Sequence, residues 1–425
     1  MSPVGGESVP AISLLITTSS ENEGVRNEIG TIRAIEGLRG VAVLWVLVFH
    51  YIVVRSGQFG DPFVEWIDSL RPLHVLVRNG FLGVDLFFLI TGFLLVLPWF
   101  KHAADGRVAP SARRFYWRRI QRIVPAYYVQ LAVLFFVFVP MINPDLWRSA
   151  SRFVLANLGL HALFLHQLTP YSAASLAING ALWTLTLEAQ YYLLLPLVAA
   201  WFVRAPKVTA AAFLAAALLW KAMAEHDLQP LIALYAAIGE RWNLPEATLR
   251  HLAATQLPAY LGHFALGILC GSAWLRNRGA NPSRLASLTL GAIAAAALAG
   301  LYAVLARGTP QFGEHAWILP PLAMAIFMWA AVSRNPTWGR KLLGAPGLGF
   351  VGRISYSIYL YHLPLILVFN KYAPAALGGL AFPCYFAIVV GIATISFRYV
   401  EQPFMRTKTG PKGEQEPGVF VRPTS

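Results

Sequence analysis

The chain has 425 residues, of which 57% are hydrophobic and only 13% charged, about half the charged share of an ordinary soluble domain. Its net charge of +14 comes from basic residues in short segments between long apolar runs, a pattern typical of the positive-inside rule and not of nucleic-acid binding. The two cysteines, Cys270 and Cys384, lie inside apolar runs, so they indicate neither a disulfide framework nor a metal site.

The two ends of the chain differ from its apolar middle. Residues 1–30 are polar and lack a basic segment followed by a long apolar one, so we expect a disordered cytoplasmic tail and no cleaved signal peptide. Residues 407–425 are rich in Pro, Gly and Lys and are expected to form a second disordered cytoplasmic tail. The region between them, 31–406, is expected to be a single transmembrane domain.

Eleven apolar runs follow one another through this domain, and a spanning helix needs about 20 mostly apolar residues. The runs lie at 38–54, 81–100, 123–141, 152–168, 182–203, 208–224, 257–275, 286–306, 315–333, 347–370 and 380–398.

Basic residues set the expected orientation, because cytoplasmic loops carry an excess of Lys and Arg. The segments 101–122 and 204–207 are both basic and are expected inside, yet three runs lie between them and only an even number can cross. Run 152–168 carries several polar residues, so we interpret it as re-entrant or interfacial. The sequence therefore predicts an all-α bundle of about ten spanning helices with both termini in the cytoplasm. Other basic loops expected on that side contain Arg276, Arg278, Arg284, Arg334, Arg340 and Lys341.

The first run places two ionisable residues on one face. Such groups at bilayer depth cost at least about 2.5 kcal/mol each, so those that persist are usually functional or buried in protein. Arg39 and His50 are eleven residues apart, or three turns plus about 20°, and about 16 Å apart along the axis. If these residues are not functional, Arg39 near the cytoplasmic end is a membrane anchor and His50 in the outer half is a packed or interfacial residue.

Two acidic residues lie in other apolar runs. Asp85, about one turn from the outer end of the second run, would orient an imidazole there and favour its protonated form, or else act as a helix cap. Glu188 shares a helical face with Tyr192, four residues later, which is also expected to line the site. Glu188 needs a partner, and a structural salt bridge is the alternative. Gly83 and Gly92 are expected to allow close helix packing.

Further polar residues mark the fifth, tenth and last runs. Ser355, Tyr359 and His362 lie on one helical stripe and are expected to line the site, with ordinary packing as the alternative. Trp183 is expected as an interface anchor at the start of its run, where it would also line the site. Glu401, at the end of the last run, is expected to have a structural role.

If the expected topology holds, His50, Asp85, Glu188 and His362 all fall in the outer half of the membrane. Histidine is the usual acid–base group near neutral pH, so we expect His50 to carry the chemistry, with Asp85 or Glu188 orienting its ring.

A set of arginines lies on the opposite, cytoplasmic side. Arg118 and Arg122 are one turn apart and are expected to grip phosphate together, although simple topology signalling is the alternative. The expected donor-binding set is Arg39, Arg113, Arg114, Arg118, Arg119 and Arg122.

Six sequence strings, in this order, resemble the membrane-bound acyltransferase-3 family. In that family an Arg precedes a His by eleven positions in the first helix, as Arg39 and His50 do here. The resemblance covers residues 33–406, with Thr91 and Thr184 where Ser is common. The other strings are G-V-D-x-F-F-x-x-[ST]-G-F from Gly83 to Phe93, R-R-x-x-R-I-x-P from Arg118 to Pro125, W-[ST]-L-x-x-E-x-x-[FY]-Y from Trp183 to Tyr192, [SAG]-Y-S-x-Y-L-x-H from Ser355 to His362, and E-x-P at Glu401 and Pro403.

The resemblance implies an O-acyltransferase that moves an acyl group, usually acetyl, from acyl-CoA to a hydroxyl of a carbohydrate or glycosylated acceptor. It implies acyl-CoA as a co-substrate, no permanently bound cofactor and no metal, and a multi-pass place in the bacterial plasma membrane. Members of the family often carry a hydrolase-like extracytoplasmic domain after the last helix. Because only about 20 residues follow Glu401, we expect no such domain here.

Two other classes fit the residues taken alone. Intramembrane His, Asp and Glu also suit the proton relay of a transporter or flippase, although no internal repeat is visible. A membrane sensor or scaffold is the third class. The sequence leaves the acceptor, the acyl length, the oligomeric state and the choice between direct transfer and an acyl-histidine intermediate open.

Overall fold

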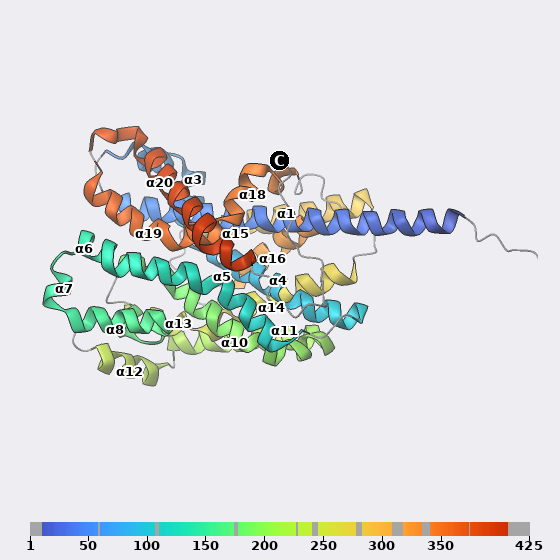
Figure 1. The fold of residues 1–425 in the computed structure, drawn as a ribbon, viewed down its shortest axis with the longest axis horizontal. Helices are drawn as coiled ribbons and strands as arrows, with labels where there is room; N and C mark the ends of the chain where they lie inside the picture. Colours follow the sequence, from blue (N-terminus) through green and yellow to red (C-terminus); the bar gives the residue numbers. More distant parts are fainter. Residues whose placement is uncertain are drawn as a thin grey trace, which may run out of the picture.

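The computed structural model describes residues 11–57, 60–106, 110–173, 177–226, 228–239, 245–277, 283–307, 318–333, 341–373 and 375–406. Every regular element in these residues is a helix, which confirms the all-α bundle expected from the apolar runs. The long helix α1 (Ala11–Arg55) extends beyond the rest of the bundle at its N-terminal end (Figure 1).

Eight helical segments in the described part of the chain are long and apolar enough to cross a membrane. Each of them contains one of the expected apolar runs. An apolar stretch in lipid forms a helix because a helix satisfies all its backbone polar groups internally. The first is the part of α1 from Gly30 to Arg55. The others contain α4 (Gly83–Asp105), α5 (Ala112–Val133), α10 (Trp183–Arg204), α11 (Pro206–His226), α14 (Leu257–Arg276), α15 (Arg284–Ala306) and α20 (Ala381–Ser396).

The runs at 347–370 and 315–333 depart from straight spans. The first is a bent pair, α18 (Pro346–Arg353) and α19 (Ser355–Tyr372), which meet at 72° and form a ninth candidate span if taken together. The second contains α16 (Leu319–Val332), which has only 14 residues. Its first turn contains two prolines, which a helix start tolerates because the N–H groups that they lack have no partner there.

Run 152–168 forms a short helix that turns back. Its helix α8 (Ser151–Ala162) has 12 residues, about 18 Å, too short to cross a hydrocarbon core of about 30 Å. The chain reverses at Phe164, whose φ of 56° is held by stacking of its ring on Tyr127, with centroids 4.4 Å apart. This geometry agrees with a re-entrant or interfacial segment.

The N-terminal segment differs from the expected disordered tail. Helix α1 begins at Ala11, inside the segment 1–30. No proline interrupts residues 11–30, and extending a helix from an existing nucleus is far easier than starting one. The expected tail 407–425 lies outside the described residues, as do Arg278, Arg334 and Arg340 of the basic loops.

Glycines allow the central helices to approach closely, as expected for Gly83 and Gly92. A Cβ at Gly92 of α4 would overlap the carbonyl oxygen of Phe264 on α14, and a Cβ at Gly267 of α14 would overlap that of Leu89 on α4. Gly83 lies in the same way against the backbone of α1. These contacts bring the backbones of α4 and α14 together in the bundle core.

Helix α19 is the buried axis around which the polar residues gather. Its residues 355–366 are buried apart from Tyr356. Pro364 has no N–H, so the carbonyl of Leu360 one turn earlier is free to accept the side-chain amide of Asn179 at 3.0 Å. Asn179 lies in η4 (Ala177–Leu182), just before α10, so this bond places the start of α10 deep in the bundle.

Candidate active site

Two histidines from opposite ends of the chain meet inside the bundle. Nε2 of His362 on α19 lies 3.1 Å from Nδ1 of His50 on α1, and their ring centroids are 4.9 Å apart. His50 Nδ1 also lies 3.0 Å from the carbonyl oxygen of Val46, and His362 Nδ1 lies 2.8 Å from that of Tyr359. His362 is fully buried, whereas His50 is partly exposed. We call His50 and His362 the histidine layer.

The same two helices make a second polar contact nearer their N-terminal ends. The guanidinium of Arg39 donates to the hydroxyl oxygen of Ser355 through Nε at 3.2 Å and Nη2 at 2.9 Å. Arg39 precedes His50 by eleven residues and Ser355 precedes His362 by seven, so α1 and α19 run in the same direction. The helical rise separates the two contacts by about 10–16 Å.

Charged residues from three other helical elements surround Arg39. Arg122 of α5, Glu188 of α10 and Glu401 of η8 (Phe397–Glu401) lie close enough to Arg39 to interact with it electrostatically. Arg119 of α5 interacts in the same way with Arg122 and Glu188. We call Arg39, Arg119, Arg122, Glu188 and Glu401 the arginine layer. Its three guanidinium groups face two carboxylates, which leaves an excess of positive charge.

Glu188 lies in the arginine layer and not at the depth of His50, where we expected it. Its carboxylate accepts hydrogen bonds from the hydroxyl of Tyr192 and, at 3.5 Å, from that of Thr91 on α4. The difference arises because α10 begins deep in the bundle, beside the middle of α19. Residues early in α10 therefore lie further from the outer surface than their position in the apolar run indicates.

Asp85 pairs with a histidine that we did not expect. Its Oδ1 lies 3.3 Å from Nε2 of His263 on α14, and the two side chains are 14% and 6% exposed. The expected orienting role of Asp85 or Glu188 at His50 is therefore not what the structure shows. The ring of His50 is held by His362 and by the carbonyl of Val46.

Tyr359 and Trp183 tie the start of α10 to its neighbours. The hydroxyl of Tyr359 lies 2.8 Å from Oγ1 of Thr184 and donates to the carbonyl of Ala181 at 2.9 Å. Trp183 is partly buried against Tyr260, with ring centroids 5.5 Å apart, so it packs into the bundle and does not serve only as an interface anchor.

The five arginines of α5 fall into two groups. Arg119 and Arg122 are partly buried and belong to the arginine layer, whereas Arg113, Arg114 and Arg118 are exposed. Arg119 and not Arg118 lies with Arg122 on the face of α5 that is turned to the bundle. The expected phosphate grip of Arg118 with Arg122 stays a prediction. The Nε atom of Arg119 is buried without a hydrogen-bond partner among the described residues.

His263 and Glu401 have roles that the sequence patterns did not assign. His263 carries the same signal as His50, an ionisable residue inside an apolar run, and that signal would have found it. Glu401 was expected to be structural, yet it is buried, accepts a hydrogen bond from Ser357 and lies near Arg39 and Arg122. Its place depends on how the last helix returns to the bundle, which no local pattern reveals.

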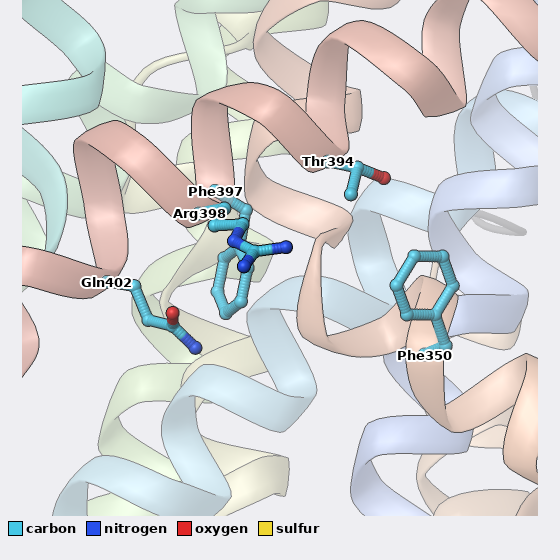
Figure 2. A pocket seen from close by; sticks show the side chains of 5 residues that line it. All are labelled: Phe350, Thr394, Phe397, Arg398 and Gln402. Carbon is cyan, nitrogen blue, oxygen red and sulfur yellow. The ribbon is translucent and has the colours of Figure 1, made fainter.

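A separate cleft lies between α18 and the last helices (Figure 2). None of the expected site residues lines this cleft, so it does not belong to the candidate active site. Its lining consists of Phe350, Thr394, Phe397, Arg398 and Gln402.

Together the two layers have the chemistry to hold an elongated anionic molecule and to move a proton at its far end. Arginine forms charge-assisted, bidentate hydrogen bonds to phosphate, and the arginine layer has positive charge to spare. The partly exposed imidazole of His50 is a base in its neutral form and an acid once protonated.

Comparison with known proteins shows that the part of the chain carrying both layers matches one protein family. Residues 32–398, which include every residue of the two layers except Glu401, match a family model described as an acyltransferase domain. The peptidoglycan O-acetyltransferase OatA of Listeria monocytogenes is 24% identical over 83% of this chain, and the O-acetyltransferase OatA of Staphylococcus aureus strain NCTC 8325 is 23% identical over 88%. A protein of Staphylococcus aureus strain COL that carries the provisional name O-acetyltransferase is 23% identical over 88% of this chain.

The chain spans 57% of the length of each of these relatives. No solved structure gives a significant match to it.

Proposed function

This chain belongs to the acyltransferase-3 family, and from that premise we propose that it transfers an acetyl group from acyl-CoA to a hydroxyl of a carbohydrate or glycosylated acceptor. The proposal includes a place in the bacterial plasma membrane, with both termini and the arginine layer on the cytoplasmic side. Acyl-CoA is proposed as a co-substrate that binds and leaves in each cycle.

One observation carries the proposal: α1 and α19, the two helices that carry the histidine layer, also join Arg39 of the arginine layer to Ser355, about 10–16 Å along their axes from the histidine contact. Acyl-CoA has the matching form, with phosphates at one end and a thioester at the end of a long, narrow pantetheine arm. Phosphates in the arginine layer would place the thioester towards His50. The buried, unpartnered Nε of Arg119 is one donor available to such an anion.

The acceptor class is supported by the named relatives, one of which is a peptidoglycan O-acetyltransferase. A sugar hydroxyl is a poor nucleophile at its own pKa and needs a base, which the partly exposed ring of His50 supplies. An envelope glycan would reach that ring from the outer side, while the donor enters from the basic side.

A single imidazole can carry out both proton transfers of the reaction. His50 takes the hydroxyl proton while the oxygen attacks the thioester carbonyl, and the C–S bond breaks with its electron pair on sulfur. The protonated His50 returns the proton to the thiolate, which leaves as coenzyme A. If His50 first takes the acetyl group itself, the same groups act in two steps.

The test uses the full chain in proteoliposomes with [14C]acetyl-CoA and lysozyme-solubilised peptidoglycan fragments as the acceptor probe. We expect acetylated fragments, with mass increments of one acetyl group. Envelope glycans of cells with and without the gene provide a second acceptor set. No acetyl increment in either assay, from a folded and inserted protein, would exclude this function.

The donor site is tested by replacing both Arg119 and Arg122 with Gln. Each charged hydrogen bond contributes about 1.5–3 kcal/mol, so the apparent KM for acetyl-CoA should rise at least about tenfold. Arg284→Gln, an exposed position at the start of α15, is the control and should leave this KM unchanged. An unchanged KM in the double variant would leave these arginines only a role in topology.

A further inference from the structure

The surroundings of His362 fix where its proton lies. Its Nδ1 atom faces two carbonyl oxygens, those of Tyr359 at 2.8 Å and Ile358 at 3.2 Å. A carbonyl oxygen only accepts hydrogen bonds, so Nδ1 must carry a proton, and in a neutral imidazole Nε2 then holds a lone pair. Because the side chain is fully buried, the neutral ring is favoured over a charged one.

That lone pair is directed at His50. Nε2 of His362 lies 3.1 Å from Nδ1 of His50, and the carbonyl oxygen of Val46 lies 3.0 Å from the same nitrogen. Both neighbours are acceptors, so Nδ1 of His50 must be the donor. In the neutral ring of His50 the other nitrogen, Nε2, is therefore unprotonated.

The opposite proton arrangement fails at several contacts at once. If His362 donated through Nε2, its bare Nδ1 would face the carbonyls of Tyr359 and Ile358. The bare Nδ1 of His50 would in turn face the carbonyl of Val46. The hydrogen bond between the two rings would only reverse its direction, while the hydrogen bonds to these backbone oxygens would be lost.

We infer that His362 is a positioning residue that selects the tautomer of His50 in which Nε2 is the free base. The inference rests on the proposed transferase function and names the atom of His50 that takes the acceptor proton. A neutral imidazole thus fills the orienting role for which we had expected Asp85 or Glu188. Unlike a carboxylate, it orients the ring without adding a negative charge beside it, so His50 is not held permanently as an imidazolium.

Solid-state 15N NMR of the histidine-labelled full chain in lipid bilayers reads the tautomer directly. The chain has ten histidines, and the signals lost in His50→Ala assign those of His50. We expect a protonated Nδ1 and an unprotonated Nε2 for His50. The reverse assignment would overturn the inference even if acetyl transfer is observed, and the expected assignment would stand even if the substrate is different.

Two substitutions of His362 separate positioning from packing. His362→Gln keeps an acceptor oxygen near the place of Nε2, whereas His362→Leu keeps bulk without an acceptor. Since a catalytic histidine in the wrong tautomer can lose as much as about 10⁴ in kcat, we expect the Leu variant to lose at least about tenfold. The KM for acetyl-CoA should not change, and Gln should recover most of the loss.

His161 provides the matched control. It is also buried and bonds the carbonyl of Asn157, four residues earlier, through Nδ1 at 2.8 Å, but it lies in α8 outside both layers. His161→Leu should keep kcat within about twofold in protein that remains folded. An equal loss in the two Leu variants, or a Gln variant no better than Leu, would reduce His362 to a packing residue.

Discussion

Some of the ionisable residues inside this bundle are matched by a partner from a distant part of the chain. Arg39 meets Ser355 and Asp85 meets His263, in both cases between different helices. An ionisable group without such a partner costs at least about 2.5 kcal/mol at the bilayer centre. His50 differs from the others because one ring nitrogen is engaged inside the bundle while the ring remains partly exposed.

Replacing His50 by Ala is expected to abolish acetyl transfer while insertion and abundance stay normal. A general base supplies about 10²–10⁴-fold, so the rate should fall at least about a hundredfold. Initial rates in proteoliposomes, normalised to the amount of inserted protein, measure the effect. If the variant kept more than about a third of the rate, His50 would be structural and His362 the next candidate.

For single residues, the sequence predicts which positions belong to the site better than it predicts their contact partners. His50, Asp85, Glu188 and His362 stand out because each is costly in an apolar run. The partner of Asp85 and the depth of Glu188 depend on how far α10 and α14 penetrate the bundle. Helix depth is a property of packing, so residue spacing within one helix does not contain it.

The spanning helices of this protein form from long apolar runs, and glycines allow some of them to pack with their backbones in contact. Gly92 and Gly267 face each other's helix backbones between α4 and α14, the helices that carry Asp85 and His263. Close backbone approach is what small residues provide in membrane bundles, where lipid gives little reason for helices to associate.

Gly92→Ala should destabilise the bundle by about 1–3 kcal/mol, the usual cost of inserting a methyl group into a packed core. The reason is the overlap of the new Cβ with the carbonyl of Phe264. The measurement is the Tm of the purified protein in detergent. Gly300→Ala in α15, where no atom lies within 4 Å, should leave Tm unchanged or raise it slightly.

The elements themselves were predictable because lipid allows few alternatives to a helix of about 20 apolar residues. The exceptions have local causes. The first turn of α16 contains two prolines, and α8 ends two residues before Phe164, whose φ is positive. The bend between α18 and α19 was not predictable, because α18 is placed by its packing on α1 and not by its own sequence.

The site has two different ends, because α1 and α19 run parallel through the bundle. Arg39 of the arginine layer meets Ser355 towards the N-terminal ends of both helices, and the histidine layer lies further along them. The basic segment 101–122 predicts that the end of α4 is cytoplasmic, and the segment after α1 is then outside.

Cysteine labelling tests this orientation in intact cells. In a chain with Cys270 and Cys384 replaced by Ala, a cysteine at Asp105 should react with a membrane-impermeant maleimide only after permeabilisation. A cysteine at Ser69, which is exposed between the first two spans, should react without it. Labelling of position 105 from outside would refute the expected topology.

The two contacts that build the site join residues 316 and 312 positions apart, which has a consequence for biosynthesis. Ribosomes add about 5–20 residues per second, so α1 waits roughly 15–60 s in the membrane before α19 is made. During that interval Arg39 lacks Ser355 and His50 lacks His362. The reactive centre is therefore completed only near the end of translation, when α19 has been made.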